Sequence, residues 1–219
     1  RMAMIEPLAP NPSVEAVLHA IIPFKYVEHT HSDAIVTITN TKNSKEKIRK
    51  IYGKNILIIP YVMPGFALAR FVYNVTKNIN WDKIEGIILL NHGLFTFDDD
   101  AKKSYEKTIK LVTKAEKYLK KQGAVLKIKN KTSKLSPTKL KKILKEISFL
   151  KEENVVAVFN GSKEAKYFAS QKNIELISQK GPLTPDHVIR TKRIPVILHK
   201  NYKKELKKYI KKYKKYFKK

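Results

Sequence analysis

Short apolar runs alternate along the chain with longer stretches in which apolar residues recur at helical spacing. Runs bounded by turn residues predict strands at 27–39, 55–59, 86–90, 124–128, 155–159 and 174–177. Apolar residues three and four positions apart predict helices at 14–22, 44–52, 64–77, 101–121, 137–150, 163–171 and 202–217. A polar linker is expected at 130–134. This alternation of strands and helices predicts an α/β layer architecture.

The predicted helix at 101–121 has clear end signals. Asp98, Asp99 and Asp100 precede it. Three consecutive carboxylates are compatible with a metal site, but we expect them to cap the helix, because anions are stabilised at a helix N-terminus. Gly123 is expected to end the helix. The apolar stripe predicts an inner face made of Tyr105, Ile109, Val112, Ala115, Glu116 and Leu119.

Length and composition narrow the class of protein. The chain has 219 residues, enough for one substantial domain or a domain with an appendage, and it has no cysteine. The lack of cysteine excludes a disulfide scaffold and a thiolate metal site, and it is typical of a cytoplasmic protein. No apolar run approaches the ~20 residues that span a membrane, so we expect no membrane partner.

The charge is strongly positive, at +27 from 46 Lys and Arg against 19 Asp and Glu. Such a balance is found in nucleic-acid-binding proteins. The excess here is almost all lysine spread along the chain, without aromatic residues interleaved with arginine, so we expect no specific nucleic-acid partner. Non-specific binding at low salt stays open, and the charge suits an anionic substrate.

Three histidines are the strongest candidates for chemistry. His29 and His31 lie two positions apart in an extended segment, so their side chains are expected on the same face. His92 follows the buried strand predicted at 86–90, in an Asn-His-Gly turn. Three imidazoles and one open position are typical of a catalytic zinc site. The alternative is that His29 and His31 form an ordinary surface pair.

Several short motifs around these histidines resemble the class II aldolase/adducin family. They are Pro12-Ser13-Val14-Glu15, His29-Thr30-His31 and Asn91-His92-Gly93-Leu94-Phe95, and the spacing from His31 to His92 is also typical of that family. Ser13, Glu15 and His19, together with the segment from Thr184 to Lys192, resemble more closely the aldolase half of bifunctional rhamnulose-1-phosphate aldolase/short-chain dehydrogenase proteins.

The resemblance implies an architecture. It is a three-layer α/β fold with a central, mostly antiparallel sheet flanked by helices. Residues 1–129 would form the aldolase core with the metal site, truncated at its N-terminus, and 130–200 a small α/β appendage of the same domain. From their own helical spacing, residues 201–219 are expected to form a basic amphipathic helix that packs on the body or on a partner subunit. A helix that lies on a membrane surface is the alternative. In the bifunctional relatives a dehydrogenase domain follows.

The resemblance also implies a reaction and its residues. His29, His31 and His92 would bind Zn2+, and Glu15 would move the proton as general base and acid. The substrate would be a ketose 1-phosphate such as rhamnulose 1-phosphate, cleaved to dihydroxyacetone phosphate and lactaldehyde. Relatives form homotetramers, so a homo-oligomer is expected.

Substrate-binding residues are expected in two places. By the resemblance, Ser13 would contact the phosphate. His187, Arg190 and Lys192, in a charged loop that also carries Asp186, would line the site. A solvated loop is the alternative for this second group.

Three other functions remain open. A sugar-phosphate 4-epimerase of the same fold is one, although such relatives carry aspartate in place of Glu15. A non-catalytic adducin-like interaction domain is another, although such relatives lose the histidines that this chain keeps. Charge alone supports the third, a basic nucleic-acid-binding protein.

Overall fold

The computed structural model describes residues 4–124, 128, 136–151, 156–199 and 201–218. The chain divides into two compact units. The first takes the described residues up to 124 and the segment Leu183–Ile189. The second takes the described residues from 128 to 182 and those from Arg190 onward. No helix among the described residues is long and apolar enough to cross a membrane.

The first unit is built on a four-stranded sheet with the order β1-β4-β3-β2. The strands are β1 (Tyr26–Thr30), β2 (Ile56–Ile59), β3 (Gly86–Leu89) and β4 (Gly93–Asp98). The outer pair β2–β3 is parallel, whereas β3–β4 and β4–β1 are antiparallel. The predicted α/β fold with a mostly antiparallel sheet is therefore confirmed.

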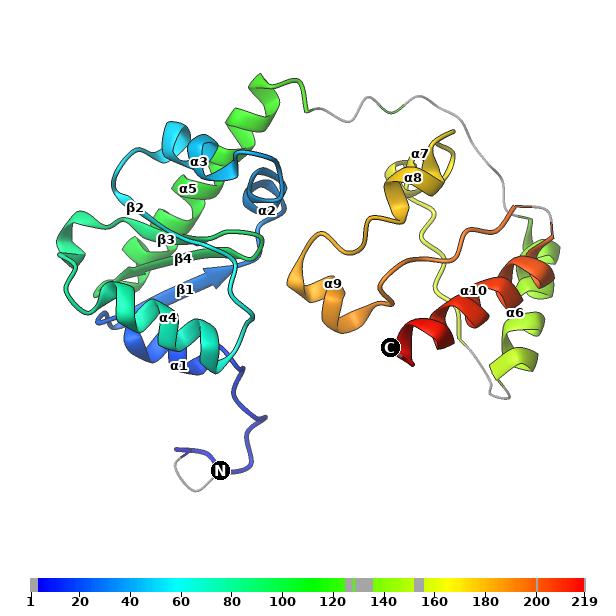
Figure 1. Cartoon of the computed structure of the whole chain (residues 1–219), viewed down its shortest axis with the longest axis horizontal. Helices are drawn as coiled ribbons and strands as arrows, with labels where there is room; N and C mark the ends of the chain where they lie inside the picture. Colours follow the sequence, from blue (N-terminus) through cyan, green and yellow to red (C-terminus); the bar gives the residue numbers. More distant parts are fainter. Residues whose placement is uncertain (1–3, 125–127, 129–135, 152–155, 200, 219) are drawn as a thin grey trace. The chain divides into compact units, whose positions relative to one another are not determined.

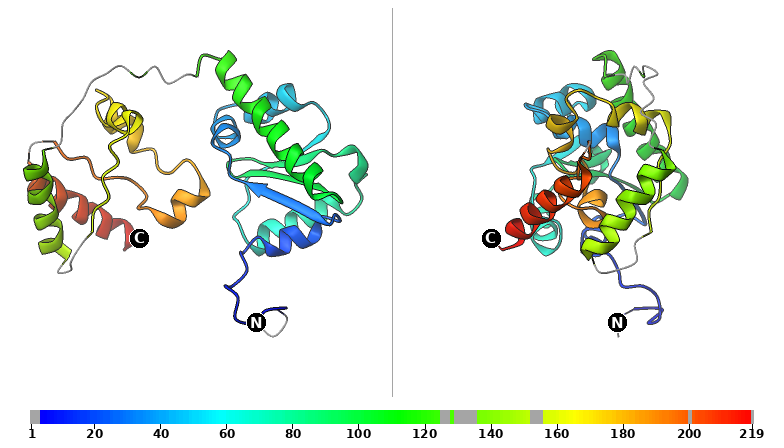
Figure 2. Two further views of the ribbon diagram at one scale, coloured as in Figure 1. Left: turned by 180° about the vertical axis from the view of Figure 1, so that it is seen from behind. Right: turned by 90° about the vertical axis from the view of Figure 1, so that its right-hand side faces the viewer.

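Helices cover both faces of this sheet (Figures 1 and 2). One face carries α1 (Ala16–Ile21) and α4 (Phe66–Thr76), and the other carries α2 (Asp33–Thr39), α3 (Ser44–Tyr52) and α5 (Ala101–Lys121). A short 3-10 helix, η1 (Trp81–Lys83), precedes β3. Alternate residues of the central strands enter the two cores: Ile87 and Leu89 face α1 and α4, whereas Ile88 faces the other side.

The second unit is helical in the part of the chain that the structure describes. It contains α6 (Pro137–Lys151), α7 (Lys163–Ala169), α8 (Ile174–Ser178) and α10 (Tyr202–Phe217). Helices α6 and α10 pack together. The hydroxyl of Tyr209 in α10 donates a 2.7 Å hydrogen bond to the carbonyl of Ile194. A helix of mostly first-unit residues, α9 (Pro185–Arg190), lies between these elements in the sequence.

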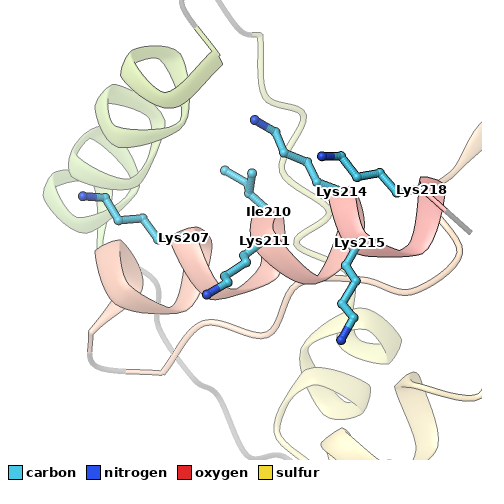
Figure 3. Close-up of a pocket in the computed structure, with 6 residues that line it drawn as sticks. All are labelled: Lys207, Ile210, Lys211, Lys214, Lys215 and Lys218. Carbon is cyan, nitrogen blue, oxygen red and sulfur yellow. The ribbon is translucent and has the colours of Figure 1, made fainter.

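A hollow of about 500 Å3 lies along α10, and Figure 3 shows the side chains around it. Its lining consists of Lys207, Ile210, Lys211, Lys214, Lys215 and Lys218. Lysine ammonium groups attract anions, but this lining has no histidine or carboxylate that could ligate a metal. The hollow therefore does not account for the metal chemistry expected from the sequence.

Residues 34–39 form helix α2, so the strand predicted over 27–39 is wrong beyond Thr30. The buried residues of α2 are Ile35, Val36, Ile38 and Thr39. Their spacing is that of one helix face, and it outweighs the strand preference of β-branched residues.

Three other strand assignments also differ. Residues 174–177, predicted as a strand, begin helix α8. Residues 156–159 are irregular, with Val156 and Val158 each 94% exposed. Strand β4, in which every residue but Asp98 is buried, has no counterpart among the predicted strands. The strand expected at 124–128 and the linker at 130–134 lie largely or wholly outside the described residues.

Helix α5 has the predicted bounds, but its inner face is rotated. The side chain of Asp100 caps it by accepting a hydrogen bond from the backbone N–H of Lys103, as predicted. Gly123, with φ of 74°, follows the helix, and its N–H donates to the carbonyl of Lys120. The residues that α5 buries are Ser104, Leu111 and Ala115, whereas Tyr105 and Ile109 are exposed.

This rotation predicts a large loss of stability at one position of α5 and a small change at another. Leu111 is 1% exposed and Ile109 is 48% exposed. Leu111→Ala should lower the free energy of unfolding by about 2–5 kcal/mol, because it leaves a cavity in the core. Ile109→Ala should change it by less than about 1 kcal/mol. Urea unfolding of both variants is the measurement, and equal losses would contradict the observed face.

Candidate metal centre

The topology of the sheet brings the three histidines together. His29 lies in β1, and its backbone partner in β4 is Phe95. His31 directly follows β1, and His92 lies in the tight turn from β3 to β4. Since β4 lies between β1 and β3, the turn that carries His92 is next to the end of β1. The turn is tight because Asn91 adopts a left-handed conformation with φ of 60°.

Glu15 completes a cluster of four potential ligands with His29, His31 and His92. One ligand atom from each lies within 4.8 Å of all the others. The Glu15 carboxylate oxygen Oε1 is 2.7 Å from Nε2 of His92 and 3.4 Å from Nε2 of His29. The Nε2 atoms of His29 and His31 are 2.9 Å apart. Three imidazoles and a carboxylate at these distances can hold one metal ion.

The hydrogen bonds behind two of the rings fix which nitrogen carries the proton. Nδ1 of His29 is 2.9 Å from the carbonyl oxygen of Leu94, and Nδ1 of His31 is 2.7 Å from Oδ2 of Asp186. Both oxygens are acceptors, so both Nδ1 atoms must be the donors. In the neutral rings, each Nε2 therefore presents a lone pair. Two lone pairs at 2.9 Å repel, unless a cation or a proton lies between them.

His92 gives a second reason to expect a cation. Its side chain is almost fully buried, at 2% exposure of the residue. Among the described residues, neither ring nitrogen has an aligned hydrogen-bond partner, although Nε2 is close to Glu15. A buried polar atom without such a partner costs about 1–3 kcal/mol. Coordination of a metal ion by Nε2 would remove that cost.

Glu15 supplies negative charge to the cluster. The nearby imidazoles of His29 and His92 hold the pKa of the Glu15 carboxyl well below its ordinary range, although partial burial acts in the opposite direction. The carboxyl is therefore an anion at neutral pH. Its charge favours a cation at the centre of the cluster, whether that cation is a metal ion or an imidazolium.

Two neighbours from β4 shape the site. A Cβ atom at Gly93 would lie 2.5 Å from the carbonyl oxygen of Thr30 and 3.0 Å from the ring carbons of both His29 and His31. Only glycine therefore allows β4 to approach the two rings this closely. Phe95 stacks on the ring of His29, with centroids 4.0 Å apart and an interplanar angle of 13°. The ring of His29 is thus held from its face as well as from Nδ1.

The other residues singled out in the sequence lie in different surroundings. Ser13 is exposed, and its hydroxyl accepts a 3.2 Å hydrogen bond from the backbone N–H of Glu15. His19 is outside the cluster of four, and burial lowers its pKa. His187 bonds to the hydroxyl of Thr184 at 2.7 Å in the first unit.

Arg190 and Lys192 belong to the second unit. There the ammonium of Lys192 lies 4.7 Å from the ring centroid of Tyr213. Asp186, by contrast, directly contacts His31, a role that the sequence did not reveal. No spacing rule relates residue 186 to residue 31, because only the tertiary fold brings them together.

Family comparisons agree with this geometry. The family described as "Class II Aldolase and Adducin N-terminal domain" matches residues 3–119, which is more than half of the chain. The chain belongs to the class II aldolase/adducin family. A second family description, "Aldolase class II, second domain", matches residues 134–219. The resemblance of the motifs to the class II aldolase/adducin family is thereby confirmed.

Two individual proteins are similar to this member of the family. "Uncharacterized oxidoreductase YuxG" of Bacillus subtilis (strain 168) is 32% identical over 207 residues, which are 90% of this chain. The chain spans only 30% of the length of that relative. The structure of the N-terminal class II aldolase domain of a conserved protein from Thermoplasma acidophilum is 44% identical, with a TM-score of 0.48, and covers 54% of this chain and 53% of its own.

Removing one histidine should abolish tight binding of a divalent ion. We expect the metal-free protein to bind one Zn2+ or Co2+ per chain, and His92→Ala to lose this site because only two imidazoles remain. His199→Ala is the matched control, since His199 is exposed and lies outside the cluster. Titration calorimetry measures both. Unchanged stoichiometry and affinity in His92→Ala would rule out His92 as a ligand.

Proposed function

We propose that this chain is a zinc-dependent class II aldolase that cleaves a ketose 1-phosphate. Rhamnulose 1-phosphate would yield dihydroxyacetone phosphate and lactaldehyde. The observation that carries the proposal is the cluster of Glu15, His29, His31 and His92, in which one ligand atom from each lies within 4.8 Å of the others. Membership of the family is consistent with this reaction but does not select it, because adducin-like members are non-catalytic.

The donor set favours zinc. His29, His31 and His92 would hold the ion through nitrogen, and imidazole suits zinc and late transition metals rather than magnesium or calcium. Three protein nitrogens leave a coordination position for a substrate oxygen, as catalytic zinc sites require. When bound, the ion supplies positive charge beside the oxygens that become negative during the reaction.

The reaction also requires proton transfer, and Glu15 is placed to perform it. When the bond between the α and β carbons of the ketose breaks, the hydroxyl on the departing β carbon loses its proton and that carbon becomes the aldehyde. The electron pair remains on the other fragment as an enediolate, which is then protonated at carbon. A carboxylate at the centre, with a side chain 15% exposed, can accept and return a proton within this site.

The substrate's phosphate has several candidate partners. We propose that Ser13 contacts it, and that His187, Arg190 and Lys192 line the site and bind the phosphate or the hydroxyls of the substrate. The net charge of +27 supports an anionic substrate. The reactive end of the substrate would lie at the histidine cluster.

The wider context of the protein is also proposed. We infer a cytoplasmic homo-oligomer, by analogy with tetrameric relatives. A dehydrogenase domain in the full-length protein is supported by the similar B. subtilis protein, which is named as an oxidoreductase and of which this chain spans 30%.

Replacing the carboxylate should separate catalysis from metal binding. Glu15→Gln should retain the zinc held by three histidines but lower the rate of aldehyde formation by about 10²- to 10⁴-fold, because the proton acceptor is lost. The assay follows lactaldehyde released from rhamnulose 1-phosphate by zinc-loaded protein. Glu106→Gln, an exposed change on α5, is the matched control and should keep full activity.

Three outcomes would count against the proposed reaction. Full activity in Glu15→Gln would contradict the role of Glu15. Formation of a 4-epimeric sugar phosphate by the wild type, without aldehyde, would replace the aldolase with an epimerase of the same fold. Zinc binding without turnover of either kind of substrate would favour a non-catalytic domain.

A further inference from the structure

We infer that Asp186 is a positioning residue of the metal centre, which fixes His31 so that Nε2 of this ring faces the ion. The inference rests on the proposed metal site. It assigns to the segment Leu183–Ile189 a contribution to a site otherwise made at the end of β1, in the β3–β4 turn and directly before α1.

The contact between Asp186 and His31 is short and links distant parts of the sequence. Oδ2 of Asp186 lies 2.7 Å from Nδ1 of His31. A carboxylate that accepts from Nδ1–H fixes the ring orientation, leaves Nε2 unprotonated and makes it a better ligand. Nε2 of His31 points at Nε2 of His29, 2.9 Å away, so the orientation set by Asp186 is the one that the cluster needs.

His31 depends on this contact more than His29 does. Nδ1 of His29 donates to a backbone carbonyl of β4, which the strand pairing holds in place. His31 lies just beyond the end of β1, so the pairing with β4 does not include it. Its ring is therefore oriented by a side chain from another segment rather than by the sheet.

Further contacts hold that segment against the first unit. The side-chain amide of Asn40 donates to the carbonyl of Leu183 at 3.2 Å. Asn91, the neighbour of His92, donates in turn to the side-chain oxygen of Asn40 at 2.6 Å. Thr184 is 4% exposed, so its side chain is buried where the segment meets the unit. The segment that carries Asp186 is thus anchored beside the turn that carries His92.

The boundary between the two family domains does not coincide with the boundary between the two structural units. Residues 183–189 fall within the range that matches the second-domain family, yet they belong to the first unit. The cluster is formed by residues of the range 3–119, which matches the N-terminal family domain. By this inference it also needs Asp186, which lies in the range 134–219 that matches the second domain.

The test compares zinc affinity in Asp186→Ala, Asp186→Asn and the wild type of the whole chain, by competition with a chelator. We expect Asp186→Ala to bind zinc about 10- to 100-fold more weakly. Asp186→Asn should lose less, because its amide oxygen still accepts from Nδ1–H. Asp82→Ala, an exposed change in η1, is the control and should bind like the wild type. Equal thermal unfolding of the metal-free variants excludes a loss of fold.

A spectroscopic readout distinguishes positioning from general stability. In zinc-loaded protein with 15N-labelled histidine, Nδ1–H of His31 should exchange slowly with water. This protection should be lost in Asp186→Ala, whereas Nδ1–H of His29, bonded to the Leu94 carbonyl, stays protected as an internal reference.

The outcomes separate this inference from the proposed function. Wild-type affinity in Asp186→Ala, or an unchanged Nδ1–H of His31, overturns the role of Asp186 and leaves the metal site intact. A wild type that binds no zinc overturns the metal site itself, and the role of Asp186 with it.

Discussion

The approach of two imidazole nitrogens to 2.9 Å is the constraint on which the candidate site depends. His29 and His31 each commit Nδ1 as a donor to an oxygen that can only accept. Both Nε2 lone pairs are thereby turned toward one point, where repulsion disfavours them unless positive charge is present. Glu15 and His92 border the same point, and the pKa of the Glu15 carboxyl is held low there. The cluster therefore has the electrostatic character of a cation site.

The fold meets the geometric demands of this cluster through the order of its strands. The antiparallel pairings place β4 between β1 and β3, so one short turn delivers His92 next to the end of β1. Gly93 then lets the backbone of β4 pass close to Thr30 and the two rings. Helices on both faces bury the central strands and keep this edge of the sheet rigid. Three of the four candidate ligands thus lie in β1, directly after it, or in the tight turn from β3 to β4, and Glu15 lies directly before α1.

The four residues of the cluster could be predicted from the sequence, whereas the secondary structure that follows His31 could not. His29, His31, His92 and Glu15 could be named because each lies in a short local motif and the motifs together resemble a known family. The strand prediction for residues 34–39 is wrong because this short segment is rich in β-branched residues, whose strand preference conflicts with their helical spacing. Burial against α5 and the sheet favours the helix.

Other features depend on information that local pattern does not contain. The inner face of α5 follows from the sheet on which it packs, so residues of similar hydrophobicity, such as Ile109 and Leu111, could not be ranked beforehand. In the sequence, Asp186 is one of several charged residues in a predicted loop. Its partner lies 155 positions away and emerged only from the tertiary fold. Local signals predict elements and motifs, whereas contacts between distant segments need the assembled structure.

The central claim is that one ion is held by imidazole nitrogens from the C-terminal end of β1, at His29 and His31, and from the β3–β4 turn, at His92. X-ray absorption spectroscopy of the zinc-loaded chain tests this directly. The account predicts three imidazole nitrogens at about 2.0–2.1 Å, with any remaining scattering from oxygen at about 2.0–2.2 Å. A first shell made only of oxygen, or one with a single imidazole, would show that the ion binds elsewhere and would contradict the account.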